Sequence, residues 1–145
     1  MEGLFRSKAG KAWVQNSCSF FHTKTIKMKK LIKVEDDPGI LDAFSLVLGS
    51  TYQLEMFNSA DLILDNQFDV PNMFIIDKQL SGTSGTVLCK HLKSDANTSA
   101  IPVALVSASP DIHKVAAEAG ADAALEKPFA VKKLREIVTG LLDRP

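Results

Sequence analysis

From residue 29 onward, short apolar runs alternate five times with segments of helical periodicity, and this alternation restricts the possible folds more than any other feature. We expect strands at residues 31–34, 52–56, 73–76, 103–106 and 123–125. We expect helices at residues 38–48, 60–66 with Ser59 as N-cap, 85–93, from the Ser109-Pro110 pair onward, and 131–142. Apolar strands that alternate with helices are typical of a parallel sheet buried between helices. The pattern therefore predicts an α/β fold with a five-stranded parallel sheet and helices on both faces.

The charge of the chain is divided unevenly along its length. The formal net charge is zero, with 17 Lys and Arg against 17 Asp and Glu. Residues 1–30 hold seven basic residues and one acidic residue, whereas residues 31–145 hold ten basic and sixteen acidic residues. We interpret residues 1–28 as a basic leader, disordered or a non-native extension, with a transit peptide or a docking arm as weaker alternatives. Residues 29–145 are then one folded domain, which lacks the strongly basic balance of a nucleic-acid binder.

The cysteine count and the hydropathy of the chain indicate its compartment. Cys18 and Cys89 are too few for a disulfide framework, which favours a reducing environment. No apolar run approaches the roughly 18 residues that a membrane-spanning helix needs. We therefore expect a cytoplasmic protein without a membrane-spanning segment.

Polar side chains follow four of the five expected strands. Glu35 and Asp36 come directly after the first strand, Asp77 ends the third, Ser107 ends the fourth, and Lys127 follows the fifth. Because the carboxyl ends of parallel strands meet at one edge of the sheet, these groups should share one crevice. Carboxylates that lie close together repel one another unless a cation compensates them, and oxygen ligands of this kind suit Mg²⁺. With a hydroxyl and a lysine nearby, the set indicates a phosphoryl-binding site.

A single acid at a strand end is usually a helix cap or a solvated side chain. Asp37, which precedes Pro38 at the start of the first expected helix, has such an interpretation as an N-cap. The whole set at the ends of four strands cannot be interpreted as caps, because helix caps that arise independently would not explain a Lys-Pro pair after a buried strand. The functional interpretation is therefore favoured for the set.

The ordered motifs give the chain a resemblance to the receiver domain of bacterial two-component response regulators, the CheY-like family. The matching segments are Val34-Glu35-Asp36-Asp37-Pro38, Ile75-Ile76-Asp77 with Gly82 and Gly85, Val106-Ser107-Ala108, Gly120-Ala121-Asp122 and Lys127-Pro128-Phe129. The resemblance covers residues 29–143 and implies a flavodoxin-like sheet with the strand order 2-1-3-4-5. It also implies a cis peptide bond between Lys127 and Pro128.

The same resemblance implies a role for each site residue. Asp77 would be the phosphoacceptor that attacks a phosphohistidine, and Lys127 and Ser107 would contact the phosphoryl group. Glu35, Asp36, Asp77 and the backbone carbonyl of Gln79 would hold Mg²⁺. Such a domain is no enzyme with an external substrate, because it catalyses only its own phosphorylation and dephosphorylation.

The resemblance also implies partners. A sensor histidine kinase or a histidine phosphotransfer protein would supply the phosphoryl group, and a downstream protein target would receive the signal. Because the sequence ends at Pro145, just after the last expected helix, we expect a stand-alone receiver without nucleic-acid binding, monomeric or weakly dimeric.

Three positions depart from the family pattern. Ala124 stands where the family usually has Tyr or Phe, so the aromatic switch is missing and the way in which the output face reads phosphorylation is in question. Ser81 replaces a usual Pro four residues after Asp77, which predicts a less rigid loop. Lys33 lies inside a strand expected to be buried on both faces, so it must reach solvent or a carboxylate, or the strand is more exposed than expected.

Three alternative functions share parts of this pattern. A pseudo-receiver that binds partners without phosphorylation is mildly favoured by Ala124 and disfavoured by the intact acidic set. A Mg²⁺ phosphatase with an aspartyl nucleophile usually has a second Asp where this chain has Gln79. A flavodoxin-like FMN protein would bind phosphate after the first strand, where Glu35 and Asp36 would repel it.

Overall fold

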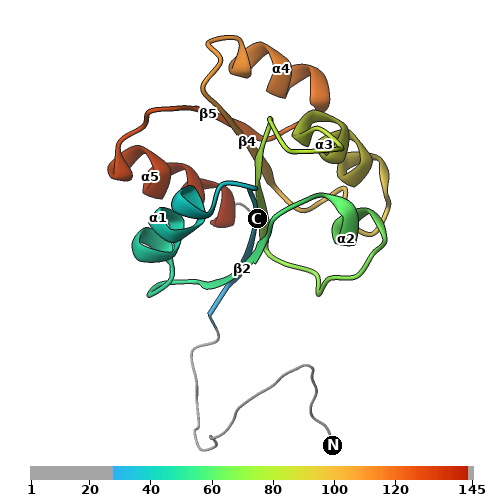
Figure 1. Ribbon diagram of the computed structural model, residues 1–145. Coiled ribbons are helices and arrows are strands. Elements are labelled where there is room, and N and C mark those ends of the chain that lie inside the picture. The colour runs from blue at the N-terminus through green and yellow to red at the C-terminus, as the bar shows by residue number, and fades with distance from the viewer. Residues whose placement is uncertain (1–27, 144–145) are drawn as a thin grey trace, which may run out of the picture.

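The computed structural model describes residues 28–143 and confirms the α/β fold (Figure 1). The strands are β1 (Lys30–Val34), β2 (Gln53–Phe57), β3 (Met73–Asp77), β4 (Val103–Ser107) and β5 (Ala123–Glu126). The helices are α1 (Pro38–Leu48), α2 (Asp61–Leu64), α3 (Gly85–Ser94), α4 (Ile112–Ala119) and α5 (Val131–Leu142). All strand pairs are parallel, and the order β2-β1-β3-β4-β5 agrees with the order implied by the family resemblance.

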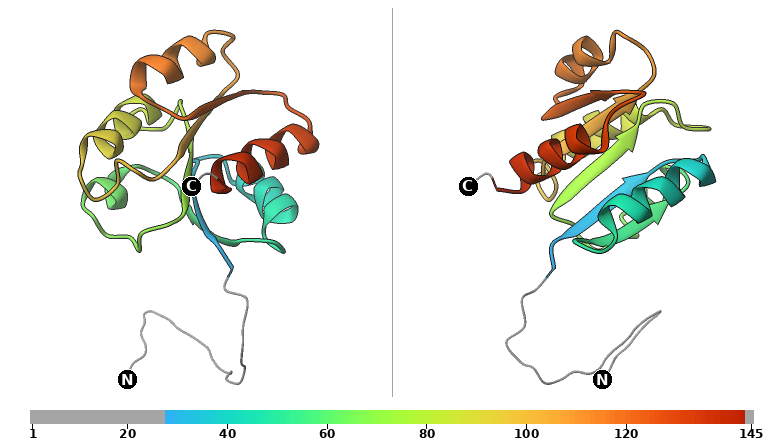
Figure 2. Two further views of the ribbon diagram at one scale, coloured as in Figure 1. Left: turned by 180° about the vertical axis from the view of Figure 1, so that it is seen from behind. Right: turned by 90° about the vertical axis from the view of Figure 1, so that its left-hand side faces the viewer.

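The sheet separates two layers of helices. Helices α1 and α5 cover one face, and α2, α3 and α4 cover the other (Figures 1 and 2). Each face has its own apolar core, and the central strands β3 and β4 are buried along their whole length. In β1, Ile32 and Val34 face the α2–α4 layer, whereas Leu31 faces the α1/α5 layer, as the alternation of side chains along a strand requires.

Side-chain caps explain the starts of α1 and α3. The carboxylate of Asp37 accepts a hydrogen bond from the N–H of Gly39 at 2.9 Å, which confirms its role as the N-cap of α1. Ser84 caps α3 in the same way through the N–H of Val87, at 3.3 Å. The α5 boundaries agree with the sequence pattern.

Two expected helices differ from the structure. The Ser109-Pro110 pair does not start α4: the N–H of Ile112 donates to the carbonyl of Ser109, so the pair lies in a turn and the helix begins at Ile112. Helix α2 covers Asp61–Leu64 only, shorter than the expected 60–66. Its N-cap is Ala60, although the Ser59 hydroxyl still accepts from the N–H of Asp61 at 3.4 Å.

The expected leader lies almost wholly outside the described residues, since residues 1–27 are not described. Among residues 28–143, no helix has the length and apolar character needed to cross a membrane.

Candidate functional site

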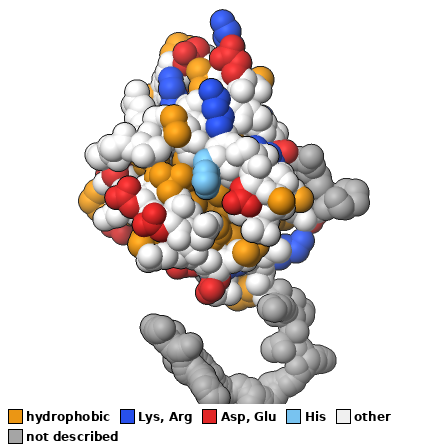
Figure 3. All heavy atoms as spheres, turned by 90° about the vertical axis from the view of Figure 1, so that its right-hand side faces the viewer, with side chains coloured by type: hydrophobic (Ala, Val, Ile, Leu, Met, Phe, Trp, Pro, Cys, Tyr) orange, Lys and Arg blue, Asp and Glu red, His pale blue; other side chains and the backbone are white. Residues whose placement is uncertain are grey.

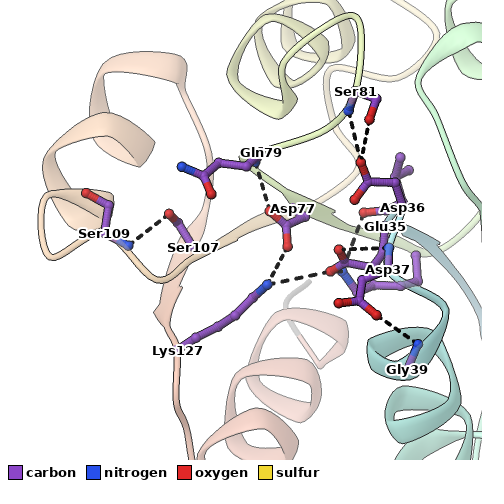
Figure 4. A network of polar contacts seen from close by, with 12 residues as sticks. Glu35, Asp36, Asp37, Gly39, Asp77, Gln79, Ser81, Ser107, Ser109 and Lys127 are labelled. Carbon is purple, nitrogen blue, oxygen red and sulfur yellow. Dashed lines mark hydrogen bonds and ion pairs between the residues drawn. The ribbon is translucent and has the colours of Figure 1, made fainter.

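The expected site residues lie at the carboxyl ends of the strands, on the edge of the sheet from which α1 and α3 begin (Figure 4). Glu35 directly follows β1, Asp77 is the last residue of β3, and Lys127 directly follows β5. The side chains of Glu35 and Asp77 are almost fully buried, at 2% and 3% exposed. Parallel pairing brings these three residues together although they are far apart in the sequence.

Both carboxylate oxygens of Asp77 accept hydrogen bonds. Its Oδ2 is 2.5 Å from the Nζ of Lys127, and its Oδ1 accepts the N–H of Gln79 at 2.8 Å. The Nζ of Lys127 also lies 3.7 Å from Oε1 of Glu35, so one ammonium lies between two carboxyls. The peptide bond between Lys127 and Pro128 is cis, which confirms the expectation.

The pKa values of Glu35 and Asp77 are shifted in opposite directions. Burial raises the pKa of Glu35 above its ordinary value, and the hydrogen bond with Asp77 raises it further. Burial also acts to raise the pKa of Asp77, but hydrogen bonds with Glu35, Lys127 and the backbone of Gln79 outweigh it and hold that pKa below its ordinary value. Of the two carboxyl groups, Asp77 is therefore the one that loses its proton more readily.

Lys33 finds a carboxylate, and β1 is not exposed. The Lys33 side chain is fully buried, its Nζ lies 3.3 Å from Oε1 of Glu35, and the carbonyl of Val34 is 3.4 Å away. The ammonium also lies 4.6 Å from the centre of the Phe44 ring. Burial lowers the pKa of Lys33, while the charges of Glu35 and Asp77 oppose that shift. Of the possibilities raised by the sequence, an internal carboxylate partner is confirmed, and exposure of the strand is wrong.

Asp36 points to a different partner. Its Oδ2 accepts two hydrogen bonds from Ser81, one from the backbone N–H at 3.0 Å and one from the hydroxyl at 2.9 Å (Figure 4). A proline at position 81 could donate neither of them. The departure from the family pattern at Ser81 therefore ties the β3–α3 loop to the end of β1.

Ser107 lies at the same edge but has its own contacts. Its hydroxyl accepts the N–H of Ser109 at 3.1 Å, and its carbonyl accepts the N–H of Lys127 at 2.8 Å. The hydroxyl is buried with β4, on the far side of Asp77 from Glu35 in Figure 4. A contact between Ser107 and a phosphoryl group on Asp77 would require the Ser107 side chain to turn toward Asp77.

The residues fit a magnesium ion by their chemistry, although their side chains are not gathered around one point. Carboxylates at neighbouring strand ends are the oxygen donors that Mg²⁺ takes. Within residues 28–143, however, no three His, Cys, Asp or Glu side chains are arranged to hold a metal ion. Ser81 holds Asp36, and Lys127 holds Asp77. The structure thus brings Glu35, Asp77 and Lys127 together, and leaves Asp36 and Ser107 in contacts of their own.

The sequence motifs identify neither Glu35 as the partner of Lys33 nor Ser81 as the partner of Asp36. The contact of Lys33 with Glu35 could have been found, because residues two apart on a strand point to the same face. No such signal exists for the contact between Asp36 and Ser81, because the two residues are 45 positions apart in the sequence and the contact depends on the path of the β3–α3 loop.

Gly85 matters for a different reason. A Cβ atom at this position would lie 2.0 Å from the carbonyl oxygen of Asp77, so only glycine lets α3 begin this close to the site.

An apolar groove of about 560 Å³ lies beside the site, between α1 and the start of α5. Its lining includes Ile40 and Phe44 from α1 and Phe129 from the segment after β5. The rings of Phe44 and Phe129 meet edge to face, with centroids 6.0 Å apart. On the side of the molecule that carries α2 and α3, Figure 3 instead shows acidic, basic and hydrophobic side chains interspersed.

Comparison with known proteins gives consistent relatives. The family described as the response regulator receiver domain matches residues 31–139. The DNA-binding dual master transcriptional regulator RpaA of Synechocystis is 31% identical over 122 residues, covering 81% of this chain and 50% of RpaA. The phosphate regulon transcriptional regulatory protein PhoB of Escherichia coli is 29% identical, covering 80% of this chain and 52% of PhoB. The chain thus spans about half the length of these relatives.

Solved structures agree with this assignment. A putative response regulator from Chloroflexus aurantiacus superposes with a TM-score of 0.76 at 31% identity, over 81% of this chain and all of that one. The BeF3-activated DrrB receiver domain gives 0.72 at 27% identity, again over 81% and 100%. Receiver domains are the phosphoacceptor signalling domains of two-component systems. Since the family match covers most of the chain and the fold and strand order agree with it, the chain belongs to the response regulator receiver domain family.

Proposed function

We propose that this receiver accepts a phosphoryl group on Asp77 from the phosphohistidine of a sensor histidine kinase or histidine phosphotransfer protein. The observation that carries the proposal is the buried Asp77 side chain at the end of β3, held by Lys127 at 2.5 Å and by the N–H of Gln79 at 2.8 Å, contacts that favour its ionised form by lowering its pKa. A carboxylate fixed in this way can act as a nucleophile without first losing a proton.

In the proposed step, a carboxylate oxygen of Asp77 bonds to phosphorus while the bond between phosphorus and the histidine nitrogen breaks. The bonding electrons leave with the imidazole, and an acyl phosphate remains on Asp77. Lys127 contributes a positive charge next to the oxygens of the transferred group, and Ser107 contributes a hydroxyl once its side chain turns inward.

We propose Mg²⁺ as the cofactor of this reaction. The ion would be held by Glu35, Asp36, Asp77 and the backbone carbonyl of Gln79. When bound, the ion supplies charge neutralisation for the phosphoryl oxygens. The donor chemistry supports this choice, and Asp36 would exchange its contact with Ser81 for one with the ion. One solved receiver of similar fold, Rcp1, at 22% identity and a TM-score of 0.65, is described as Mn(2+)-bound.

The apolar groove beside the site supports a docking position for the partner. It runs along α1 and includes Lys127 in its lining, so a partner helix seated there would lie beside the phosphoacceptor site. Curated relatives include the histidine kinase P4 of Formosa agariphila, 34% identical over 123 residues that make up 9% of that protein.

We further propose that the output is a contact with a downstream protein and not with nucleic acid, made by the receiver as a stand-alone monomer or weak dimer in the cytoplasm. Residues 31–145 hold sixteen acidic and ten basic residues, which opposes binding to a phosphate backbone. The thiol of Cys89 is free and buried, in keeping with a reducing compartment. A gel shift with random duplex DNA tests whether the receiver binds nucleic acid. Sedimentation of the phosphorylated chain tests whether it is a monomer or a weak dimer.

We also propose that the receiver unit is residues 29–145 and that residues 1–28 are not needed for it. Deletion of residues 1–27 should leave both the melting temperature and the affinity for Mg²⁺ unchanged. A large loss of thermal stability would show instead that the deleted segment packs on the domain.

The proposed function is tested by incubating the chain with acetyl phosphate or phosphoramidate and Mg²⁺, followed by intact mass measurement. The wild type should gain one phosphoryl group, and Asp77→Ala should gain none, nor should the wild type without Mg²⁺. Asp65→Asn, which removes an exposed carboxylate elsewhere, is the matched control and should behave as wild type. No gain with any donor would instead favour a pseudo-receiver that binds partners without phosphorylation, which the absence of an aromatic residue at Ala124 mildly supports.

A further inference from the structure

Lys33 is a second cation at the site, and neither the fold nor the proposed phosphoryl transfer accounts for it. Its side chain is fully buried, although it lies in β1 between Met56 of β2 and Ile75 of β3, where an apolar residue would pack without cost. The side chain points to the α1/α5 layer and ends at Glu35.

The contacts of the Lys33 ammonium are too few and too long to repay its burial by hydrogen bonding alone. The two hydrogen bonds measure 3.3 and 3.4 Å, near the upper limit for such bonds, and the third contact is the face of the Phe44 ring. Burial of an isolated ammonium costs several kcal/mol, so a favourable electrostatic surrounding must compensate for it. That surrounding is the group of carboxylates at the carboxyl ends of β1 and β3.

A count of charges shows what Lys33 changes there. Glu35, Asp36 and Asp77 carry three negative charges when ionised, and Lys127 and Lys33 carry two positive ones. The metal-free site then has a net charge of −1, and a bound divalent ion would change it to +1. Without Lys33, the net charge of the metal-free site would be −2, which one divalent ion would neutralise.

We propose that Lys33 is an internal counter-cation that competes with the divalent ion for the negative charge of the site. By pairing with Glu35, it stabilises the metal-free arrangement and lowers the affinity for Mg²⁺, so that the site fills only at higher concentrations of the ion. Lys33 is a positioning residue, because it acts through Glu35 and does not touch Asp77. The inference rests on the proposed magnesium site.

The test measures Mg²⁺ binding by isothermal titration calorimetry, without a phosphoryl donor. Lys33→Met keeps the length of the side chain and removes the charge. It should bind Mg²⁺ about tenfold more tightly than the wild type, which corresponds to about 1.4 kcal/mol. The rise in melting temperature caused by Mg²⁺ should increase in parallel. Lys90→Met, which removes one exposed charge from α3, is the matched control and should bind Mg²⁺ as the wild type does.

A double variant checks that Lys33 acts through Glu35. In the Glu35→Gln background, Lys33→Met should change the dissociation constant for Mg²⁺ much less than it does in the wild type. A second variant, Lys33→Gln, keeps a donor for Glu35 and the carbonyl of Val34, and it should shift Mg²⁺ affinity in the same direction as Lys33→Met.

Several outcomes overturn the proposal. Unchanged or weaker Mg²⁺ binding by the Lys33 variants, or failure of both single Lys33 variants to fold, would show that Lys33 has only a structural role. If neither the wild type nor any variant binds Mg²⁺, the proposed magnesium site is wrong and the inference is wrong with it. The outcomes that concern only the Lys33 variants leave phosphorylation of Asp77 untouched, because the mass measurement on the wild type decides it separately.

Discussion

The two ends of the sheet both carry buried or half-buried lysine–carboxylate contacts, but their charge balance differs. At the amino ends, the Nζ of Lys93 donates to Oδ2 of Asp122 at 2.9 Å and to the carbonyl of Ile101 at 3.0 Å. The same Asp122 oxygen accepts the N–H of Val103 at 2.9 Å. This contact pairs one cation with one anion through short hydrogen bonds.

At the carboxyl ends, Glu35 and Asp77 share two lysines, and Asp36 adds a third carboxyl group. Lys127 lies between Asp77 and Glu35, and Lys33 reaches only Glu35, at 3.3 Å. The amino-end contact pairs one cation with one anion, whereas at the carboxyl end the three carboxyl groups outnumber the two lysines. We interpret that excess as the part of the site that a metal ion and a phosphoryl group complete.

The largest expected effect is at the unbalanced end. Lys127→Met should reduce the rate of phosphorylation by acetyl phosphate about 100-fold, because the ammonium next to the transferred oxygens is lost. The initial rate of phosphoryl gain by intact mass measures this. Lys78→Met, which removes the lysine next to Asp77 in the sequence, is the control and should keep most of the rate. A Lys127 variant as fast as that control would contradict the difference between the two ends.

An intermediate effect is expected at the balanced end. Lys93→Met should lower the free energy of unfolding by about 2 kcal/mol, because the hydrogen bonds of its ammonium to Asp122 and to the carbonyl of Ile101 are lost. Urea unfolding measures this loss. The phosphorylation rate of the folded variant should equal that of the wild type, since Lys93 lies at the opposite end of the sheet. A marked fall in that rate would show that the two ends are not independent.

The smallest expected effect is a pH dependence of stability. Because burial raises the folded-state pKa of Glu35 above its ordinary value of 4.5, the folded state holds this proton more tightly than the unfolded state. The contribution of Glu35 to stability is therefore present below pH 4.5 and is lost as the pH rises through the folded-state pKa. Urea unfolding of the wild type and Glu35→Gln, from pH 4 upward, should show the wild type losing stability relative to the variant. The opposite trend would mean that Glu35 is ionised at all these pH values.

Much of this arrangement could be predicted from the sequence, because it depends on periodicity. Alternation of apolar runs placed all five strands, and the rule that strand ends meet at one edge placed Glu35, Asp77 and Lys127 together. Local capping chemistry placed the start of α1 at Asp37. These features depend on residues close in sequence or on the general geometry of parallel sheets.

The rest depends on contacts that periodicity does not determine. The Ser109-Pro110 pair satisfies the pattern of a helix start, yet the chain makes a further turn there before α4 begins. The contact between Asp36 and Ser81 is set by the path of a loop. For Lys33, the pattern indicates the face of β1 on which it lies, but whether it reaches solvent or Glu35 depends on the packing of α1 against the sheet.

The most direct test of the central claim identifies the residue that is modified. After incubation with acetyl phosphate and Mg²⁺, borohydride reduces an aspartyl phosphate to the alcohol of homoserine, which peptide mass mapping can locate. The account predicts homoserine at position 77 and at no other position. A phosphorylated chain with an intact Asp77, modified instead at Ser107 or at a histidine, would contradict it.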